Sequence, residues 1–352
     1  MDSALVELLV DPISAQPLRL HVEESDAENH VIAGHLHSAA GRSFPIVNGI
    51  PRLVVSDDDN QRQTGESFGF KWNRRASYDS PRFRSDIQAW LVARYGFATV
   101  DEMRKFFGGR RRIVDLGCGS GFTSSLWMEP SWRGDGDAEW IGVDLSTAID
   151  VARDRLACMP GTHFVQADIL HLPFRSDSFD TVYAEGVLHH TPSTERALGA
   201  AARVLASGGE LLFYVYRRKA PLREFTDDYI RAAVSRLDPE QAWEAIRPIT
   251  RLGKALADLH IDVEVSEDVP LLGIKAGRYD VQRLIYWHVA KLYWNDGFSL
   301  EENNHVNFDW YHPTYAHRHT EDEIRGWCKG AGLTIQHFDA QESGYTVRAI
   351  KG

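Results

Sequence analysis

The chain has 352 residues, of which 43% are apolar, so it can bury the core of one large domain or two modest ones. Its 39 basic and 50 acidic side chains give a formal charge of −11, which disfavours binding to nucleic acid and to anionic membranes. Three widely spaced cysteines offer neither a disulfide framework nor a paired-cysteine metal site. The first residues lack the basic segment of a signal peptide, and no apolar stretch approaches the roughly 20 residues that cross a bilayer. These features predict a cytoplasmic protein.

The first 110 residues predict two small units. Residues 1–56 contain alternating stretches, LRLHV and HVIAGHL, separated by turn residues, and this pattern predicts a β-rich module. Residues 57–110 begin with the polar stretch SDDDNQRQTGES, which is interpreted as a linker, and continue with helices between Phe68 and about Phe107.

Residues 111–216 alternate between strand and helix patterns. Buried strands are predicted at RRIVDLGCG, EWIGVDLS, THFVQADI, FDTVYAEGV and GELLFYVY. Ser193 is expected to cap the helix before the last of them, and Gly208 and Gly209 to end that helix. Five strands that alternate with helices imply a parallel sheet covered on both faces.

The alternation is interrupted by residues 217–319, which contain amphipathic helical stretches and an aromatic-rich end. It resumes at residues 320–352, where Thr320 and Glu323 form a capping-box pattern before a helix and a closing antiparallel pair of strands. The predicted fold is therefore α/β, with a helical cap inserted after the fifth strand of a Rossmann-like, seven-stranded sheet.

The sharpest motif is IVDLGCGSGF, in which Asp115 ends a strand and Gly117, Gly119 and Gly121 alternate in the following turn. Glycine tolerates positive φ and lets the backbone approach a ligand closely. The spacing differs from the dinucleotide pattern G-x-G-x-x-G. Taken alone, the motif is also compatible with a purely steric turn.

Further acidic residues follow the next two strands. Asp144 can accept hydrogen bonds from both hydroxyls of a ribose, and Asp168 with Ile169 suits an adenine ring. The structural alternatives are an acid at a helix N-terminus for Asp144 and a turn residue for Asp168. Because these residues end consecutive parallel strands, we expect them to share one crevice.

These motifs resemble class I S-adenosylmethionine-dependent methyltransferases, in particular methyltransferase type 11. The resemblance covers residues 111–216 and the final helix and hairpin. It implies S-adenosylmethionine as cofactor and S-adenosylhomocysteine as product. It also implies that the glycine turn passes under the methionine part, with Glu185 at the pocket floor. Asp115, by its own chemistry, can orient this turn or accept a hydrogen bond from an ammonium group. The second motif, GVDLS, contributes Asp144 and Leu145.

The N-terminal module resembles the Trm112-like segment, derived from a zinc ribbon, that precedes some bacterial methyltransferases. The matching stretches are LVDPIS at residues 9–14 and GRSFPIVNGIP at residues 41–51. The cysteines of metal-binding members are absent from both, so the sequence predicts no zinc and no other metal.

Three residues near the fourth strand are candidates for the catalytic base: His189, His190 and Tyr183. Histidine accepts protons near neutral pH, although the histidine pair could also have only a packing role.

The aromatic-rich end of the insertion is expected to contact the substrate through Trp310, Tyr311, His312 and Tyr315. The alternative is that these rings form the cap's own core. The motif FGFKWNRR is expected to pack across the cofactor mouth, with Trp72 or Arg74 near the methionine carboxylate.

The sequence therefore favours methyl transfer to a small molecule, with no membrane partner and with nucleic acid disfavoured. Two alternatives stay open. One is an enzyme that uses another part of the same cofactor and releases methylthioadenosine, and the other is a non-catalytic, partner-binding protein. The oligomeric state and the acceptor atom are not predicted.

Overall fold

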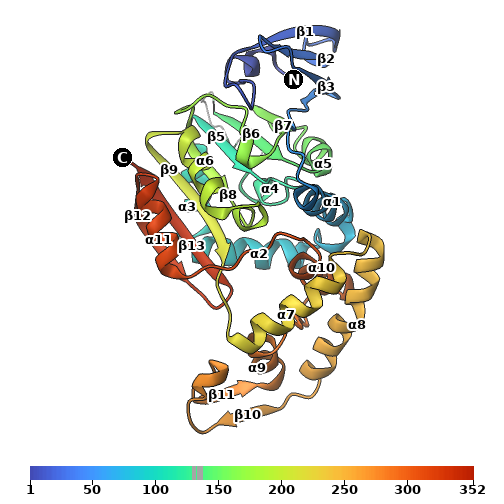
Figure 1. The fold of residues 1–352 in the computed structure, drawn as a ribbon, viewed down its shortest axis with the longest axis vertical. Helices are drawn as coiled ribbons and strands as arrows, with labels where there is room; N and C mark the ends of the chain where they lie inside the picture. The colour runs from blue at the N-terminus through green and yellow to red at the C-terminus, as the bar shows by residue number, and fades with distance from the viewer. Residues whose placement is uncertain (129–131, 133–137) are drawn as a thin grey trace.

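A computed structural model describes residues 1–128, 132 and 138–352. The N-terminal module forms one end of the molecule (Figure 1). After the short helix η1 (Ser3–Glu7) it contains one antiparallel sheet, in the order β1-β2-β3-β4. Its strands are β1 (Leu18–Ser25), β2 (Val31–Ser38), β3 (Ser43–Val47) and β4 (Ile50–Pro51). The β-rich character of this module is confirmed, while its kinship with the Trm112-like segment stays a prediction.

An ion pair between Asp11 and Arg42 lies where the stretches that resemble the Trm112-like segment lack the metal-binding cysteines. The Asp11 carboxylate is buried and accepts hydrogen bonds from the Ile13 and Ser14 amides and from Arg42 Nε at 2.8 Å. Although burial raises the pKa of Asp11, Arg42 and the amides lower it well below its usual range. This contact links the two stretches that carry the resemblance. Within the described ranges, no group of three or more His, Cys, Asp or Glu residues could hold a metal ion.

The predicted linker is wrong, because most of it is helix. Helix α1 (Asp59–Asn73) begins directly after Asp58, whose side chain accepts hydrogen bonds from the Asn60 and Gln61 amides. The buried face of α1 is polar or small and includes Gln61, Thr64, Ser67 and Lys71. The sequence of this segment therefore lacks the repeat of apolar residues every three or four positions by which a helix is predicted. Two predicted helices follow, α2 (Pro81–Arg94) and α3 (Val100–Gly108), with the short η2 (Arg75–Ser77) before them.

The central sheet has seven strands in the order β12-β13-β9-β8-β5-β6-β7, which confirms the predicted fold class. Its five parallel strands are β5 (Arg112–Leu116), β6 (Glu139–Asp144), β7 (Thr162–Gln166), β8 (Phe179–Ala184) and β9 (Leu205–Tyr216). The final hairpin, β12 (Leu333–Ala340) and β13 (Gly344–Lys351), joins antiparallel to β9. The crossover segments contain α4 (Ser124–Trp127), α5 (Ala148–Arg155), η3 (Ile169–His171), η4 (Leu188–His190), α6 (Thr194–Val204) and α11 (Glu321–Gly330).

The predicted N-terminal caps of α6 and α11 are confirmed. Ser193 accepts a hydrogen bond from the Arg196 amide, and Thr320 forms a capping box with Glu323. The predicted end of α6 is wrong, because α6 ends at Val204 and β9 begins at the next residue. Gly208, with φ of 74°, instead lies within β9, close to an irregularity in the pairing of β8 with β9.

The insertion forms a lobe at the opposite end of the molecule from β1–β3 (Figure 1). It contains α7 (Pro221–Val234), α8 (Pro239–Ala257), α9 (Val281–His288) and α10 (Leu300–Tyr311). It also contains a small hairpin that the sequence analysis missed, β10 (Asp262–Val265) and β11 (Gly277–Asp280), with η5 (Pro270–Leu272) between its strands. Helix α1 packs on α8 and α10, so the lobe combines the insertion with a segment from before the sheet. Among the described helices, none is long and apolar enough to cross a membrane.

Candidate functional site

A cavity of about 600 Å³ lies at the carboxyl ends of the parallel strands, beneath the cap. The sheet contributes residues from the turns after four strands and from the end of β9, as expected for ligand sites of open α/β sheets. These residues are Gly117, Asp144, Leu145, Ile169, Glu185, Tyr214 and Tyr216. Helices α1, α2, α9 and α10 contribute further walls, together with the segment after α9 and the turn between β12 and β13.

The glycine turn after β5 has the strained geometry that its sequence predicts. Gly117, Gly119 and Gly121 have φ values of 67°, 53° and 68°. A Cβ atom on Gly117 would lie 2.2 Å from Val187 Cγ2, and one on Gly119 would lie 2.6 Å from Trp72 Nε1. Gly117 lines the cavity, whereas the other two glycines lie behind it. Glycine is therefore required here both for φ and for space.

The Asp144 carboxylate is anchored at the edge of the cavity. Its Oδ2 accepts a hydrogen bond from the Gly119 amide at 2.8 Å, and its Oδ1 accepts hydrogen bonds from Ser146. Burial raises the pKa of Asp144, while these hydrogen bonds lower it. The apolar side chains of Leu145 and Ile169 line the same part of the cavity. A fixed carboxylate beside two apolar side chains fits an adenosine, with the carboxylate toward the ribose and the apolar groups toward the base.

Two of the predicted acidic cofactor residues, like Gly119 and Gly121, do not line the cavity. Asp115 is buried below the turn and bonds the Ser124 hydroxyl, and burial raises the pKa of Asp115 to about 7. Asp168 caps η3, because its carboxylate accepts a hydrogen bond from the Leu170 amide and bonds His171 Nδ1 at 3.0 Å. Both side chains thus shape turns of the site from behind its surface.

Glu185 lines the cavity and is held by two residues of α2 and its C-terminal end. It accepts a hydrogen bond from the Tyr95 hydroxyl at 2.7 Å and forms an ion pair with Arg94. The buried Arg94 guanidinium stacks on Trp90 at 3.7 Å and on Tyr214 at 4.1 Å, measured to the ring centroids. Sequence reasoning missed Arg94, although an arginine within the largely apolar stretch AWLVARYGF was a usable signal.

Of the three candidate bases, only His190 lines the cavity. Its Nδ1 lies 2.6 Å from the Tyr315 carbonyl oxygen, which can only accept, so Nδ1 must carry the proton. Its Nε2 is consequently a bare acceptor, and no described residue bonds it. Burial lowers the pKa of His190 to about 4, so the ring is neutral at pH 7.

The other two candidate bases are packed into the interior. The ring centroids of His189 and Tyr216 are 3.8 Å apart, and the Tyr183 ring packs against those of Phe107 and Trp140. Both are fully buried and do not line the cavity. A histidine pair and a strand tyrosine look equivalent in sequence, and only the structure distinguishes the ring that reaches the cavity.

The four aromatic residues predicted to contact substrate do not line the cavity, which corrects their predicted location. Trp310 and Tyr311 donate hydrogen bonds to the buried Asp227 carboxylate, at 2.8 and 2.9 Å. His312 bonds the Ser67 hydroxyl through Nδ1 at 2.8 Å, and Tyr315 donates to Asp58 at 2.9 Å. For Trp310 and Tyr311 the physical reason is the phase of α10, which presents its other face to the cavity through His305, Val306 and Asp309. His312 and Tyr315 follow the end of this helix and are held by their partners in and before α1.

Three residues that the sequence analysis did not assign form a buried polar group on this side of the cavity. Lys71 of α1 forms an ion pair with Asp309 of α10, and the Tyr216 hydroxyl donates to Asp309 at 2.8 Å. Burial raises the pKa of Asp309, but Lys71 holds it well below its usual range. Lys71 lies within the FGFKWNRR motif, beside Trp72, which lines the cavity as predicted. Arg74 instead pairs with Glu240 and stacks on Trp243.

Comparison with known proteins places these observations in context. Residues 114–213 match the family described as "Methyltransferase domain". The chain is 32% identical over 142 residues to "Probable tRNA methyltransferase 9B" of Mus musculus, covering 37% of this chain and 29% of that protein. It is 28% identical over 155 residues to "Phthiotriol/phenolphthiotriol dimycocerosates methyltransferase" of Mycobacterium leprae, covering 43% and 56%.

Solved structures with a similar arrangement include an S-adenosylmethionine dependent methyltransferase from Mesorhizobium loti. It is 19% identical, with a TM-score of 0.38, and the match covers 70% of this chain and 92% of that one. The chain is 28% identical over 242 residues to "Uncharacterized protein syc1184_c" of Synechococcus sp. (strain ATCC 27144 / PCC 6301 / SAUG 1402/1), and this match covers 66% of this chain and 50% of that protein. The chain therefore spans at most about half of the length of the first curated relatives. The match to a methyltransferase domain is therefore confined to residues 114–213, which contain the glycine turn, Asp144 and His190.

Proposed function

We propose that this protein transfers the methyl group of S-adenosylmethionine to a small molecule. The observation that carries the proposal is a single cavity, whose lining includes the adenosine-fitting residues Asp144 and Ile169 together with His190. The buried Nε2 of His190 has no hydrogen-bond partner among the described residues. When bound, the cofactor supplies a methyl group on a positively charged sulfur, which is already activated for displacement. The protein then needs to hold the acceptor in line and to remove its proton.

His190 is the base in this proposal. Its neutral ring, with the proton fixed on Nδ1 by the Tyr315 carbonyl oxygen, directs the lone pair of Nε2 to a proton donor. The aromatic side chains of Phe68, Trp72 and Tyr214 line the cavity and limit access of water.

The preference for a small acceptor rests on the lining of the cavity and on charge. Cap residues, among them Tyr286, Lys291 and His305, line the cavity together with the predicted cofactor residues, and the net charge of −11 opposes a phosphate backbone. Relatives named for tRNA and for lipid substrates both occur, so the name of a relative does not decide the substrate.

The test begins with titration of S-adenosylmethionine and S-adenosylhomocysteine into the purified full chain. We expect both to bind, and a chain that binds neither would favour a non-catalytic, partner-binding role. Incubation with pools of small metabolites should then release S-adenosylhomocysteine and add one methyl group to an acceptor, as followed by mass spectrometry. Release of methylthioadenosine instead would favour the enzyme that uses another part of the cofactor.

A further inference from the structure

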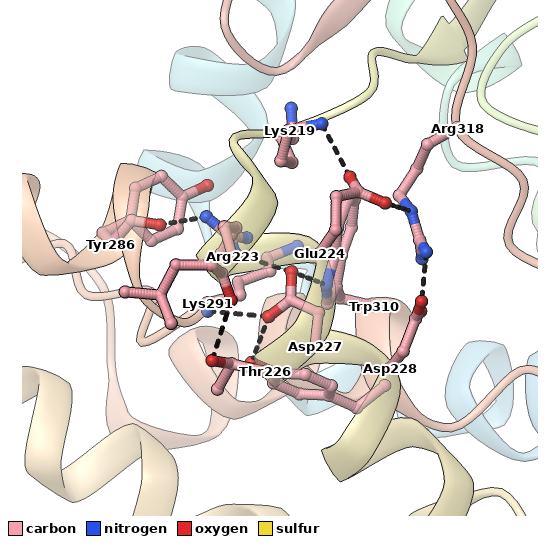
Figure 2. A network of polar contacts seen from close by, with 12 residues as sticks. Lys219, Arg223, Glu224, Thr226, Asp227, Asp228, Tyr286, Lys291, Trp310 and Arg318 are labelled. Atoms are coloured by element: carbon pink, nitrogen blue, oxygen red, sulfur yellow. Dashed lines mark hydrogen bonds and ion pairs between the residues drawn. The ribbon is translucent and has the colours of Figure 1, made fainter. Parts of the chain in front are cut away.

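The buried ring of Trp310 is surrounded by positive charge inside the cap (Figure 2). Four cationic groups lie within 6 Å of its ring centroid. They belong to Lys291 at 4.8 Å, Arg223 at 5.4 Å, Arg231 at 5.6 Å and Lys219 at 5.8 Å. They come from α7 and from the segments that flank α7 and α9.

The carboxylates around this ring already have partners. Arg223 Nε pairs with Asp227, whose two oxygens also accept hydrogen bonds from Trp310, Tyr311 and the backbone amide of Lys291. Lys219 and Arg231 donate to uncharged backbone carbonyls, those of Ser343 and Pro313 among them. The other carboxylates nearby have cationic partners outside the cluster. Asp309 is paired with Lys71, and both Glu224 and Asp228 are paired with Arg318 (Figure 2). Glu342, which lines the cavity, pairs with Arg217 at 3.8 Å. The cluster therefore holds more cations than its carboxylates neutralise.

Lys291 is the member of this cluster that lines the cavity. Its side chain is almost fully shielded from solvent, and its ammonium has no hydrogen-bond or ion-pair partner among the described residues. Burial, and then the charge of Arg223, lower the pKa of Lys291 to about 7, although Asp309 opposes this shift. An ammonium group in such surroundings is strongly stabilised by an anion that enters the cavity.

The walls beside Lys291 indicate the rest of the ligand. The cap lines the cavity with three further aromatic side chains and one more cation, which are Tyr286, Trp287, Tyr293 and Arg283. Arg283 donates to the Trp294 carbonyl oxygen at 3.4 Å and has no carboxylate partner among the described residues. Aromatic walls next to two cations without a carboxylate suit a flat apolar body that carries negative charge.

We propose that the methyl acceptor is a molecule with an aromatic body and one anionic group, a carboxylate or a phosphate, and that Lys291 binds this group. The inference deepens the proposed function and rests on it for the identity of the ligand as methyl acceptor. Lys291 is a binding residue here, and it fixes the acceptor at the cap side of the cavity while His190 serves the reacting end.

The test uses the full chain, first titrated with S-adenosylhomocysteine and then saturated with it. Three probes share one ring system: a naphthalene carboxylate, the corresponding naphthyl phosphate and the uncharged naphthalene carboxamide. We expect at least one anionic probe to bind about 10-fold or more tightly than the carboxamide, because charge-assisted hydrogen bonds exceed neutral ones. The anion that binds more tightly identifies the acidic group.

Three variants locate the effect. Lys291→Met should abolish the preference for the anion, while Lys291→Arg should retain most of it. Lys275→Met is the matched control, since Lys275 is 83% exposed and pairs with Asp268 away from the cavity, and it should leave the preference unchanged. Unaltered affinity for S-adenosylhomocysteine shows that each variant is folded.

The proposal is overturned if the carboxamide binds the wild-type chain as tightly as both anions, if no probe binds, or if Lys291→Met retains the preference. These outcomes differ from failure of the proposed function, which is a chain that binds no S-adenosylhomocysteine. In that case the same three probes, titrated without it, still decide whether Lys291 holds an anion. If Lys291→Met does not fold, the wild-type comparison and Lys291→Arg decide.

Discussion

The two halves of the cavity are built in different ways. The half that we propose for the cofactor comes from turns at the ends of neighbouring parallel strands, where backbone groups and short side chains, such as Gly117 and Asp144, line the cavity. The acceptor half comes from helices far apart in sequence, and buried charges such as Lys71 and Lys291 dominate it. A site made from strand ends is constrained by the sheet, whereas a site made from a cap depends on how several helices pack.

The largest expected effect concerns the ion pair that joins α1 to the cap. Asp309→Asn leaves the buried ammonium of Lys71 without its carboxylate, so we expect the free energy of unfolding to fall by about 3–5 kcal/mol. Urea denaturation of the full chain measures this change.

Two comparisons sharpen that result. The double variant Lys71→Met/Asp309→Asn should recover part of the loss, because it removes the unpaired charge. Asp258→Asn breaks an exposed pair with Lys254 and should cost less than about 1 kcal/mol. Equal losses for Asp309→Asn and Asp258→Asn would mean that the acceptor half does not depend on buried charge.

The second effect concerns the glycine turn of the cofactor half. Gly117→Ala combines a positive φ with a Cβ 2.2 Å from Val187, so we expect about 2–4 kcal/mol of destabilisation and loss of S-adenosylhomocysteine binding. Thermal unfolding and calorimetric titration measure the two quantities.

Gly208→Ala is the matched control for the turn. Gly208 also has a positive φ, of 74°, but a Cβ atom there meets nothing within 4 Å. Its cost should be limited to about 1–2 kcal/mol of backbone strain, with cofactor affinity unchanged. If Gly117→Ala and Gly208→Ala lose the same amount of stability and keep the same cofactor affinity, the close contact between Gly117 and Val187 does not determine the shape of the cavity at the glycine turn.

The third effect separates the two predicted acidic contacts of the cofactor. Asp144→Ala should weaken S-adenosylhomocysteine binding by about 1–3 kcal/mol, because the ribose hydroxyls lose their charged acceptor. Asp168→Ala should have a smaller effect, since its carboxylate caps η3 and does not line the cavity. Titration of both variants decides, and unchanged affinity in Asp144→Ala would remove Asp144 from the site.

The difference between the halves also explains how far the sequence could be interpreted. Asp144 and Ile169 were predictable because strand ends in a parallel sheet meet at one edge, so a position in sequence implies a position in space. The role of Lys71 was not predictable, because its partner Asp309 lies 238 residues away in the sequence. In addition, the buried face of α1 is polar, so the sequence of this helix resembles that of a linker. Trp310 was assigned to the substrate on composition alone, and the phase of α10 turned it into the cap instead.

His190 belongs to both halves, and its pH dependence gives the smallest expected effect. The residue follows β8, but its Nδ1 proton is held by Tyr315 from the chain that leaves the cap. Its pKa is lowered to about 4 in the folded chain, against an ordinary value of 6.5, so the unfolded chain binds the proton more readily. The stability that neutral His190 contributes is therefore complete above pH 6.5 and is lost as the pH falls toward 4.

Urea denaturation at several pH values tests this prediction. Between pH 6.5 and 4 the free energy of unfolding of His190→Asn should fall less steeply than that of the wild-type chain, with a difference in slope of up to about 1 kcal/mol per pH unit. His30→Asn, which alters an exposed histidine beside Asp26, should keep the wild-type slope. A wild-type slope in His190→Asn would mean that the cap does not hold this ring neutral, and the link between the two halves would have to be sought elsewhere.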